Sequence, residues 1–131
     1  MAASILDRHP ALELTALTAR TDAGKRLRDV YPRHRVDLVM EEFDADRIAE
    51  AADAVVLGYP HKAAAPVVVA LRERGVKVVD LSADFRLSRE LYEREYQPHE
   101  APELLAEAVY GLPELHRAEI AAASLLSLIH I

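Results

Sequence analysis

Three short segments of the sequence carry side chains that could bind or transform a small molecule. They are residues 18–20, 59–61 and 80–84, and each follows an apolar run. The guanidinium of Arg20 presents a fork of donors that matches phosphate oxygens, so it could hold a phosphate, or it could be a solvated loop arginine. His61 could carry a proton or donate a hydrogen bond to a ligand, because imidazole titrates near neutral pH, or it could only cap the helix that follows.

Two aspartates, Asp80 and Asp84, lie on either side of Ser82 in the third segment. Paired carboxylates can do acid–base work. Aspartates around a turn more often accept hydrogen bonds from nearby backbone N–H groups. The pattern therefore favours a role in shaping the loop.

The sequence shows no pattern of metal ligands. Its six histidines, at positions 9, 34, 61, 99, 116 and 130, have no local ligand spacing, and there is no cysteine to join them. We expect no metal site, no disulfide and no thiol nucleophile in this chain.

The elements around these segments follow an α/β pattern. The apolar run 54–59 predicts a buried strand, residues 62–74 a helix that ends at Gly75, and residues 76–81 a second strand. A strand, a helix and a strand in so few residues predict parallel pairing through a right-handed crossover. Ligands of open parallel sheets bind outside the carboxyl ends of the strands, which is where the three segments fall.

The rest of the chain is predicted from shorter signals. Alternation and β-branched residues predict strands at 12–18 and 36–40. Asp44 and Ser88 are candidate N-caps for helices at 44–52 and 88–95. Further helices are expected at 2–8, 101–108 and 114–123, with turns at 21–24 and 111–113.

Composition narrows the class of protein. The chain has 131 residues, 51% of them hydrophobic, which suits one globular domain. The net charge of −6 argues against nucleic-acid binding, which needs a basic surface. No signal peptide and no apolar run of membrane-spanning length is visible, so we expect a cytoplasmic protein with no membrane partner.

Several motifs taken together resemble one enzyme family. In order along the chain they are R-H-P at 8–10, T-A-R at 18–20, A-G-K at 23–25, P-H at 60–61, V-V-D-L-S-A-D-F-R-L at 78–87, H-E-A-P at 99–102 and V-Y-G-L-P-E-L at 109–115. This set is similar to the N-acetyl-γ-glutamyl-phosphate reductases of arginine biosynthesis. The resemblance covers nearly the whole chain.

The resemblance implies a fold, a cofactor and a reaction. Members have a Rossmann-type, doubly wound NADP domain and a separate catalytic domain, and act as homo-oligomers. They reduce a small-molecule acyl phosphate to the semialdehyde through a cysteine thioester that accepts hydride from NADPH. The implied cofactor-binding residues are Thr18 and Arg20 at the adenosine ribose and 2′-phosphate, Pro60 and His61 on the path to the nicotinamide, and Ser82 on the neighbouring strand end. Asp84, Phe85 and Arg86 are expected to stabilise the loop beside them.

Both ends of the chain depart from the family pattern. The family begins with a strand and a G-x-x-G-x-x-G phosphate loop, and neither is found here. Aligned without gaps, residues 128–131 take the places of N-P-G-C, so Ile131 stands at the nucleophile's position. We expect residues 1–127 to be a partial NADP-binding domain lacking its first strand and phosphate loop, followed by a non-family tail at 128–131.

Such a fragment has predictable properties. No catalytic residue is assigned to it, and we expect it to be inactive alone, with little affinity for NADP. Strands at 12–18 and 54–59 would present an unpaired apolar edge, which predicts poor solubility.

Two alternatives remain open from the sequence. One is the related reductase of lysine biosynthesis, which acts on a carrier-protein-linked aminoadipyl phosphate. The other is a stand-alone α/β binding module without catalysis. Aspartate-semialdehyde dehydrogenase shares the chemistry, but the motifs at 78–87 and 109–115 fit it poorly.

Overall fold

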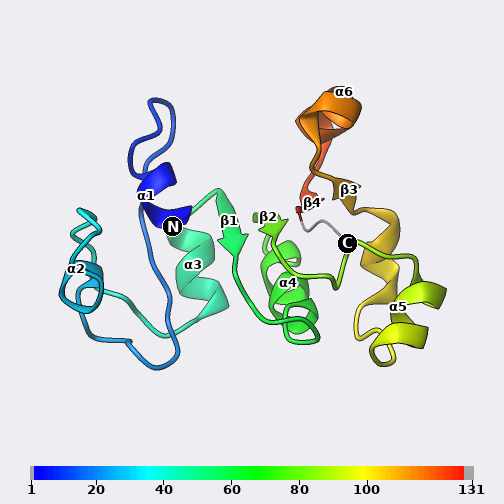
Figure 1. Cartoon of the computed structure of the whole chain (residues 1–131), viewed down its shortest axis with the longest axis horizontal. Coiled ribbons are helices and arrows are strands. Elements are labelled where there is room, and N and C mark those ends of the chain that lie inside the picture. The colour runs from blue at the N-terminus through cyan, green and yellow to red at the C-terminus, as the bar shows by residue number, and fades with distance from the viewer. Residues whose placement is uncertain (1, 129–131) are drawn as a thin grey trace. The chain divides into compact units, whose positions relative to one another are not determined.

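A computed structural model describes residues 2–128 of the chain. The chain divides into two compact units, residues 1–52 and 53–131 (Figure 1). None of the helices in the described chain combines the length and the apolar character that a bilayer crossing requires.

The first unit consists of short helices joined by irregular chain. The helices are α1 (Ala2–Leu6), α2 (Leu27–Val30) and α3 (Ala45–Ala51). The predicted N-cap is confirmed, since the Asp44 carboxylate accepts a hydrogen bond from the N–H of Arg47 at 2.9 Å. The buried apolar side chains of this unit are Val36, Met40 and Ile48.

The two strands predicted in the first unit are wrong. Residues 12–18 and 36–40 form no continuous ladder. They pair at isolated bridges, Thr18 with Glu41 and Arg26 with Val39, and the Met40 carbonyl accepts one further bond from the N–H of Gly24. A strand needs a neighbour along its whole length to take up its N–H and C=O groups, and alternation alone does not supply one.

The second unit is built on a parallel sheet. Its strands are β1 (Ala54–Leu57), β2 (Lys77–Asp80), β3 (Val109–Tyr110) and β4 (Leu125–Ser127), in the order β1-β2-β4-β3. Every pair of neighbours is parallel. The α/β class and the predicted crossover are therefore confirmed, and β1 lies at an edge of the described sheet as expected.

Helices connect these strands. They are α4 (Ala65–Arg72), α5 (Arg89–Glu95), the 3₁₀ helix η1 (Pro102–Ala106) and α6 (Pro113–Ala122). α4 packs against β2, and its Val68 and Leu71 are completely buried. The remaining apolar core of this unit includes Leu57, Val76, Val78, Phe85, Tyr92 and Leu125.

The helix limits show which signals in the sequence were reliable. Gly75 follows α4 with a φ of 77°, and Ser88 caps α5 by accepting from the N–H of Leu91. The helix predicted at 62–74 begins later, at Ala65, because Lys62 has a left-handed φ of 74° that no α-helix accommodates. The helix predicted at 101–108 is a short 3₁₀ turn, and α6 is kinked at His116, whose φ is −127°.

Candidate functional site

The carboxyl ends of β1 and β2 bring two of the three predicted segments together. Leu57 and Asp80 are register partners at these ends, so the loops that follow them begin side by side. The two loops meet where the N–H of Ala83 donates to Nδ1 of His61 at 2.9 Å. The structure therefore places Pro60, His61 and Ser82 at one edge of the sheet, as the parallel topology requires.

The segment 80–84 forms a closed hydrogen-bonded turn. The Asp80 carboxylate accepts from the Ser82 N–H at 3.1 Å and from the Ser82 hydroxyl at 2.7 Å. The Ser82 hydroxyl oxygen in turn accepts from the Asp84 N–H at 3.1 Å. All three side chains are completely buried. The loop-shaping role favoured by the sequence is thus confirmed for both aspartates.

Burial also sets the charge behaviour of this turn. Removal from water raises the pKa of Asp80, while the two hydrogen bonds from Ser82 partly oppose the shift and the nearby Asp84 charge adds to it. Asp80 therefore has no solvent-accessible carboxylate to offer as a general acid or base in this arrangement.

Asp84 ties the start of α4 to the turn. Its carboxylate accepts from the N–H groups of Lys62 at 2.8 Å, Ala64 at 3.1 Å and Ala65 at 3.3 Å. These groups lie at the positive end of the helix, and Ala64 offers no side chain to cap them. A carboxylate 20 residues away in sequence does the capping instead.

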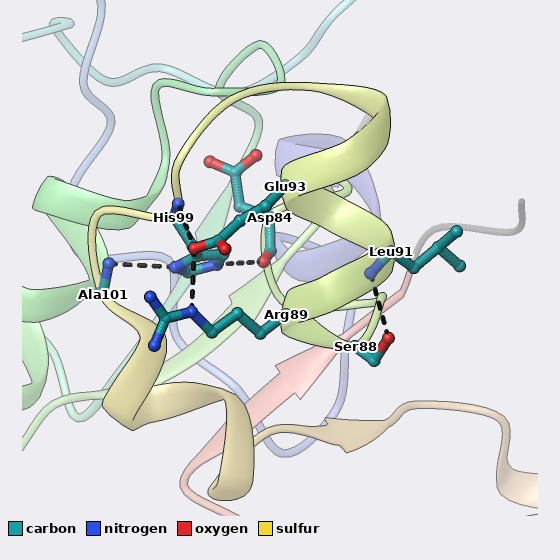
Figure 2. Close-up of polar contacts among 7 residues, drawn as sticks. All are labelled: Asp84, Ser88, Arg89, Leu91, Glu93, His99 and Ala101. Atoms are coloured by element: carbon teal, nitrogen blue, oxygen red, sulfur yellow. Dashed lines mark hydrogen bonds and ion pairs between the residues drawn. The ribbon is translucent and has the colours of Figure 1, made fainter.

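A second layer of side chains holds Asp84 from behind. The Tyr92 hydroxyl donates to the Asp84 carboxylate at 3.1 Å, and burial together with that negative charge raises the pKa of Tyr92. Figure 2 shows the His99 ring between the Asp84 backbone carbonyl and the N–H of Ala101. Because Nδ1 of His99 accepts from Ala101, Nε2 carries the proton that reaches Asp84.

The loop that carries His99 is fixed by α5. The Glu93 carboxylate accepts from the His99 N–H and from the Arg89 guanidinium (Figure 2). Both contacts, the His99 N–H first, lower the pKa of Glu93. The turn at 80–84, the start of α4 and the loop after α5 thus form one polar network.

Arg86 is a cation at this edge that the sequence assigned only to loop stability. Its guanidinium lies 3.6 Å from the centroid of the Tyr110 ring, a stacked cation–π contact. Its Nε is buried with no hydrogen-bond partner. Within residues 2–128 no carboxylate is paired with it, so it can receive an anion. The sequence alone could not reveal this anion-binding role, because Arg86 and Tyr110 are far apart along the chain.

Thr18 and Arg20 belong to the first unit, whereas the network just described belongs to the second. Both side chains are exposed. Thr18 forms the bridge with Glu41, and the N–H of Ala19 donates to the carbonyl of Glu41. No described carboxylate makes an ion pair with Arg20, so its guanidinium is available to a phosphate.

Two further predictions concern a metal site and the position of the nucleophile. Across residues 2–128, no group of three or more histidine and carboxylate side chains could hold a metal ion. Ile131, predicted to occupy the nucleophile's position, lies outside the described residues.

Comparison with known proteins identifies relatives of this chain. Residues 2–123 match the family model for the semialdehyde dehydrogenase NAD-binding domain. The chain is 54% identical over 125 residues to an N-acetyl-γ-glutamyl-phosphate reductase of Syntrophobacter fumaroxidans, which covers 93% of this chain and 36% of that protein. It is 47% identical over 126 residues to the protein of the same name from Citrifermentans bemidjiense, and this match covers 94% of this chain and 36% of that protein.

A solved structure supports the fold. Aspartate semialdehyde dehydrogenase with NADP from Candida albicans matches with a TM-score of 0.62 at 21% identity, covering 91% of this chain and 31% of that one. The parallel sheet with its helices is therefore Rossmann-like. The chain spans about a third of the length of the proteins it matches.

Proposed function

The chain belongs to the family of semialdehyde dehydrogenase NAD-binding domains, and from that premise we propose that it is the cofactor-binding part of an N-acetyl-γ-glutamyl-phosphate reductase. The observation that carries the proposal is the 54% identity to a reductase of that name across 93% of the chain. The same name on the relative at 47% identity favours the arginine pathway over the lysine pathway.

The proposed cofactor is NADP. The family's description and the NADP in the structural neighbour support a nicotinamide cofactor. Thr18 and the unpaired Arg20 would hold the adenosine ribose and its 2′-phosphate, for which a guanidinium fork is suited. Pro60 and His61 would flank the nicotinamide end, and the buried Ser82, whose hydroxyl donates to Asp80, would shape the turn beside it. The residues fit the group: the exposed guanidinium of Arg20 suits its 2′-phosphate, and His61 has a ring nitrogen left to offer it.

The reaction joins a reduction to the loss of phosphate. The acyl phosphate, NADPH and a proton give the semialdehyde, NADP⁺ and inorganic phosphate; NADPH supplies the hydride when bound. The thiol that such a reaction uses is not among these 131 residues, which contain no cysteine. We therefore propose that this chain binds and orients the cofactor and is inactive alone.

Arg86 extends the role of this edge beyond the cofactor. The Arg86 guanidinium lies over the Tyr110 ring, and no described carboxylate neutralises its charge, so its outer nitrogens can receive an anion. We propose that it binds the phosphoryl group of the acyl phosphate. This places the substrate anion beside the turn at 80–84.

The remaining parts of the proposal concern the whole protein. We propose that the cofactor-binding domain extends to residue 127, and that the complete enzyme is a cytoplasmic homo-oligomer. Its partner is a small molecule, since a chain of net charge −6 does not suit nucleic acid.

The test uses the complete gene that encodes these residues. The purified product is assayed for NADP reduction with N-acetylglutamate semialdehyde, with and without inorganic phosphate. We expect reduction that requires phosphate and that prefers NADP to NAD. The Arg20→Ala variant should raise the KM for NADP about tenfold and leave the KM for NAD unchanged, because it removes a charge-assisted contact to the 2′-phosphate. Phosphate-independent reduction, or none, would contradict the proposal.

A further inference from the structure

The hydrogen bond between Ala83 and His61 decides which nitrogen of the imidazole carries the proton. The N–H of Ala83 donates to Nδ1 of His61 at 2.9 Å. A ring nitrogen that accepts a hydrogen bond has no proton of its own. In the neutral ring the proton is therefore on Nε2, and Nε2 is a donor.

Both partners of this bond are fixed by the same turn. Ala83 is completely buried between Ser82 and Asp84, whose hydrogen bonds to Asp80 and to each other set the direction of its N–H. On the other side, the N–H of Lys62, directly after His61, donates to Asp84. The imidazole thus has little freedom to exchange its partner.

The other side of the ring is open. His61 is exposed, in contrast to the buried turn that holds it. The Tyr96 ring lies 6.0 Å from it, centroid to centroid, and is tilted by 58°. Within residues 2–128, only Ala83 is hydrogen-bonded to the ring, so Nε2–H has no acceptor among these residues.

The backbone next to His61 is strained in a way that keeps this arrangement. Lys62 has a φ of 74°, a left-handed conformation that is unfavourable for a residue with a side chain. The hydrogen bond to the buried Asp84 offsets that cost. Strained residues held by surrounding contacts are concentrated at binding and catalytic sites.

We propose that His61 is a hydrogen-bond donor of fixed tautomer, which presents Nε2–H at the carboxyl end of β1 to an oxygen atom of the bound ligand. The acceptor is a carboxamide oxygen of the cofactor or a phosphoryl oxygen of the acyl phosphate. This inference rests on the proposed function. It makes His61 a positioning residue and not a proton carrier, since relaying a proton through the ring would require Nδ1 to give up the Ala83 N–H.

The first part of the test is the tautomer itself. The ¹⁵N-labelled 131-residue chain is studied by multiple-bond ¹H–¹⁵N correlation at about pH 8, well above the pKa of a free imidazole. His61→Gln identifies the His61 signals by their loss. We expect a protonated Nε2 and an unprotonated Nδ1. His99, whose Nδ1 also accepts from a backbone N–H, is the internal reference. A proton on Nδ1 of His61, or an averaged pair of tautomers, overturns the proposal.

The second part identifies the acceptor. The 131-residue chain is expected to bind little NADP, so this part uses the product of the complete gene, labelled with ¹⁵N in its histidines. It is titrated with NADPH and, separately, with acetyl phosphate, while the Nε2 signal of His61 is followed. A response to NADPH identifies the cofactor as the source of the acceptor, and a response to acetyl phosphate identifies the acyl phosphate.

Two variants test whether a hydrogen-bond donor at the position of Nε2 is needed for binding. The amide of His61→Gln reaches as far as Nε2 and keeps a donor there, whereas the amide of His61→Asn reaches only as far as Nδ1. For the probe that responds, we expect a Kd within about twofold of the parent for Gln and raised about tenfold for Asn. Binding of NADPH with no response at Nε2 to either probe, or equal Kd values for the two variants, overturns the donor assignment and leaves the proposed function intact. No binding of either probe, with the tautomer fixed, contradicts the proposed function as well.

Discussion

The interactions that stabilise the first unit internally differ from those that stabilise the second. In the first, few apolar side chains are buried, the bridges are isolated, and ion pairs such as Arg26 with Asp37 lie at the surface. In the second, four strands pair in register, and a buried polar network connects the ends of β1 and β2. Exposed ion pairs contribute little to stability, whereas buried hydrogen-bonded charges are costly to disrupt. Rigidity is therefore concentrated at the edge that carries the candidate site.

Removing the Asp84 carboxylate should destabilise the second unit, because the buried polar network depends on it. Asp84→Ala leaves three backbone N–H groups and the Tyr92 hydroxyl without their acceptor in a buried position. We expect a loss of about 3–5 kcal/mol in the free energy of unfolding, because each orphaned buried donor costs about 1–3 kcal/mol and water recovers part of it. Urea denaturation followed by circular dichroism measures this loss. A loss below about 1 kcal/mol would show that the network does not hold the unit.

The matched change in the first unit should have a smaller effect. Asp44 also caps a helix, α3, but it is exposed and accepts a single hydrogen bond. Asp44→Ala should cost about 1 kcal/mol, the usual value of an N-cap. The same urea denaturation compares the two variants. A larger loss for Asp44→Ala than for Asp84→Ala would reverse the comparison between the units.

Replacing Asp80 should change the free energy of unfolding least, and at pH 8 the change should be a stabilisation. Burial raises its pKa above the ordinary 3.8, so ionising it is harder in the folded than in the unfolded chain. Its contribution to stability is full below pH 3.8 and is lost as the pH rises through the raised pKa.

Asp80→Asn tests that sign. Asparagine is uncharged at every pH and can still accept from the Ser82 N–H. At pH 8 the variant should be more stable than the parent, by up to about 1 kcal/mol, and the difference should vanish toward pH 3. Thermal unfolding across that pH range measures it. A variant less stable at pH 8 than at pH 4, relative to the parent, would contradict the buried-charge penalty.

The same contrast between units explains which elements could be predicted from the sequence. Asp44, Gly75 and Ser88 mark helix ends correctly, because a cap is a contact between neighbours in the chain. Strands at 12–18 and 36–40 were predicted wrongly, since pairing depends on a distant partner that alternation does not reveal. β3, with two residues, is too short for any periodic pattern to show.

Some features of the candidate site could be predicted from the sequence and others could not. Parallel topology alone predicts that His61 and Ser82 meet at one edge, and the structure places them there. The capping of α4 by Asp84 and the stacking of Arg86 on Tyr110 join segments about 20 residues or more apart. Such contacts depend on how the loops pack, and no local signal specifies them.

The most direct test of the account is a titration of the ¹⁵N-labelled chain with NADPH, followed by its backbone amide shifts. Weak binding is sufficient, because shifts in fast exchange are visible at millimolar affinity. The account predicts the largest changes in residues 58–62 and 82–86, at the carboxyl ends of β1 and β2, with a second group at 18–20. Changes confined to other parts of the chain, or none at saturating cofactor, would contradict it.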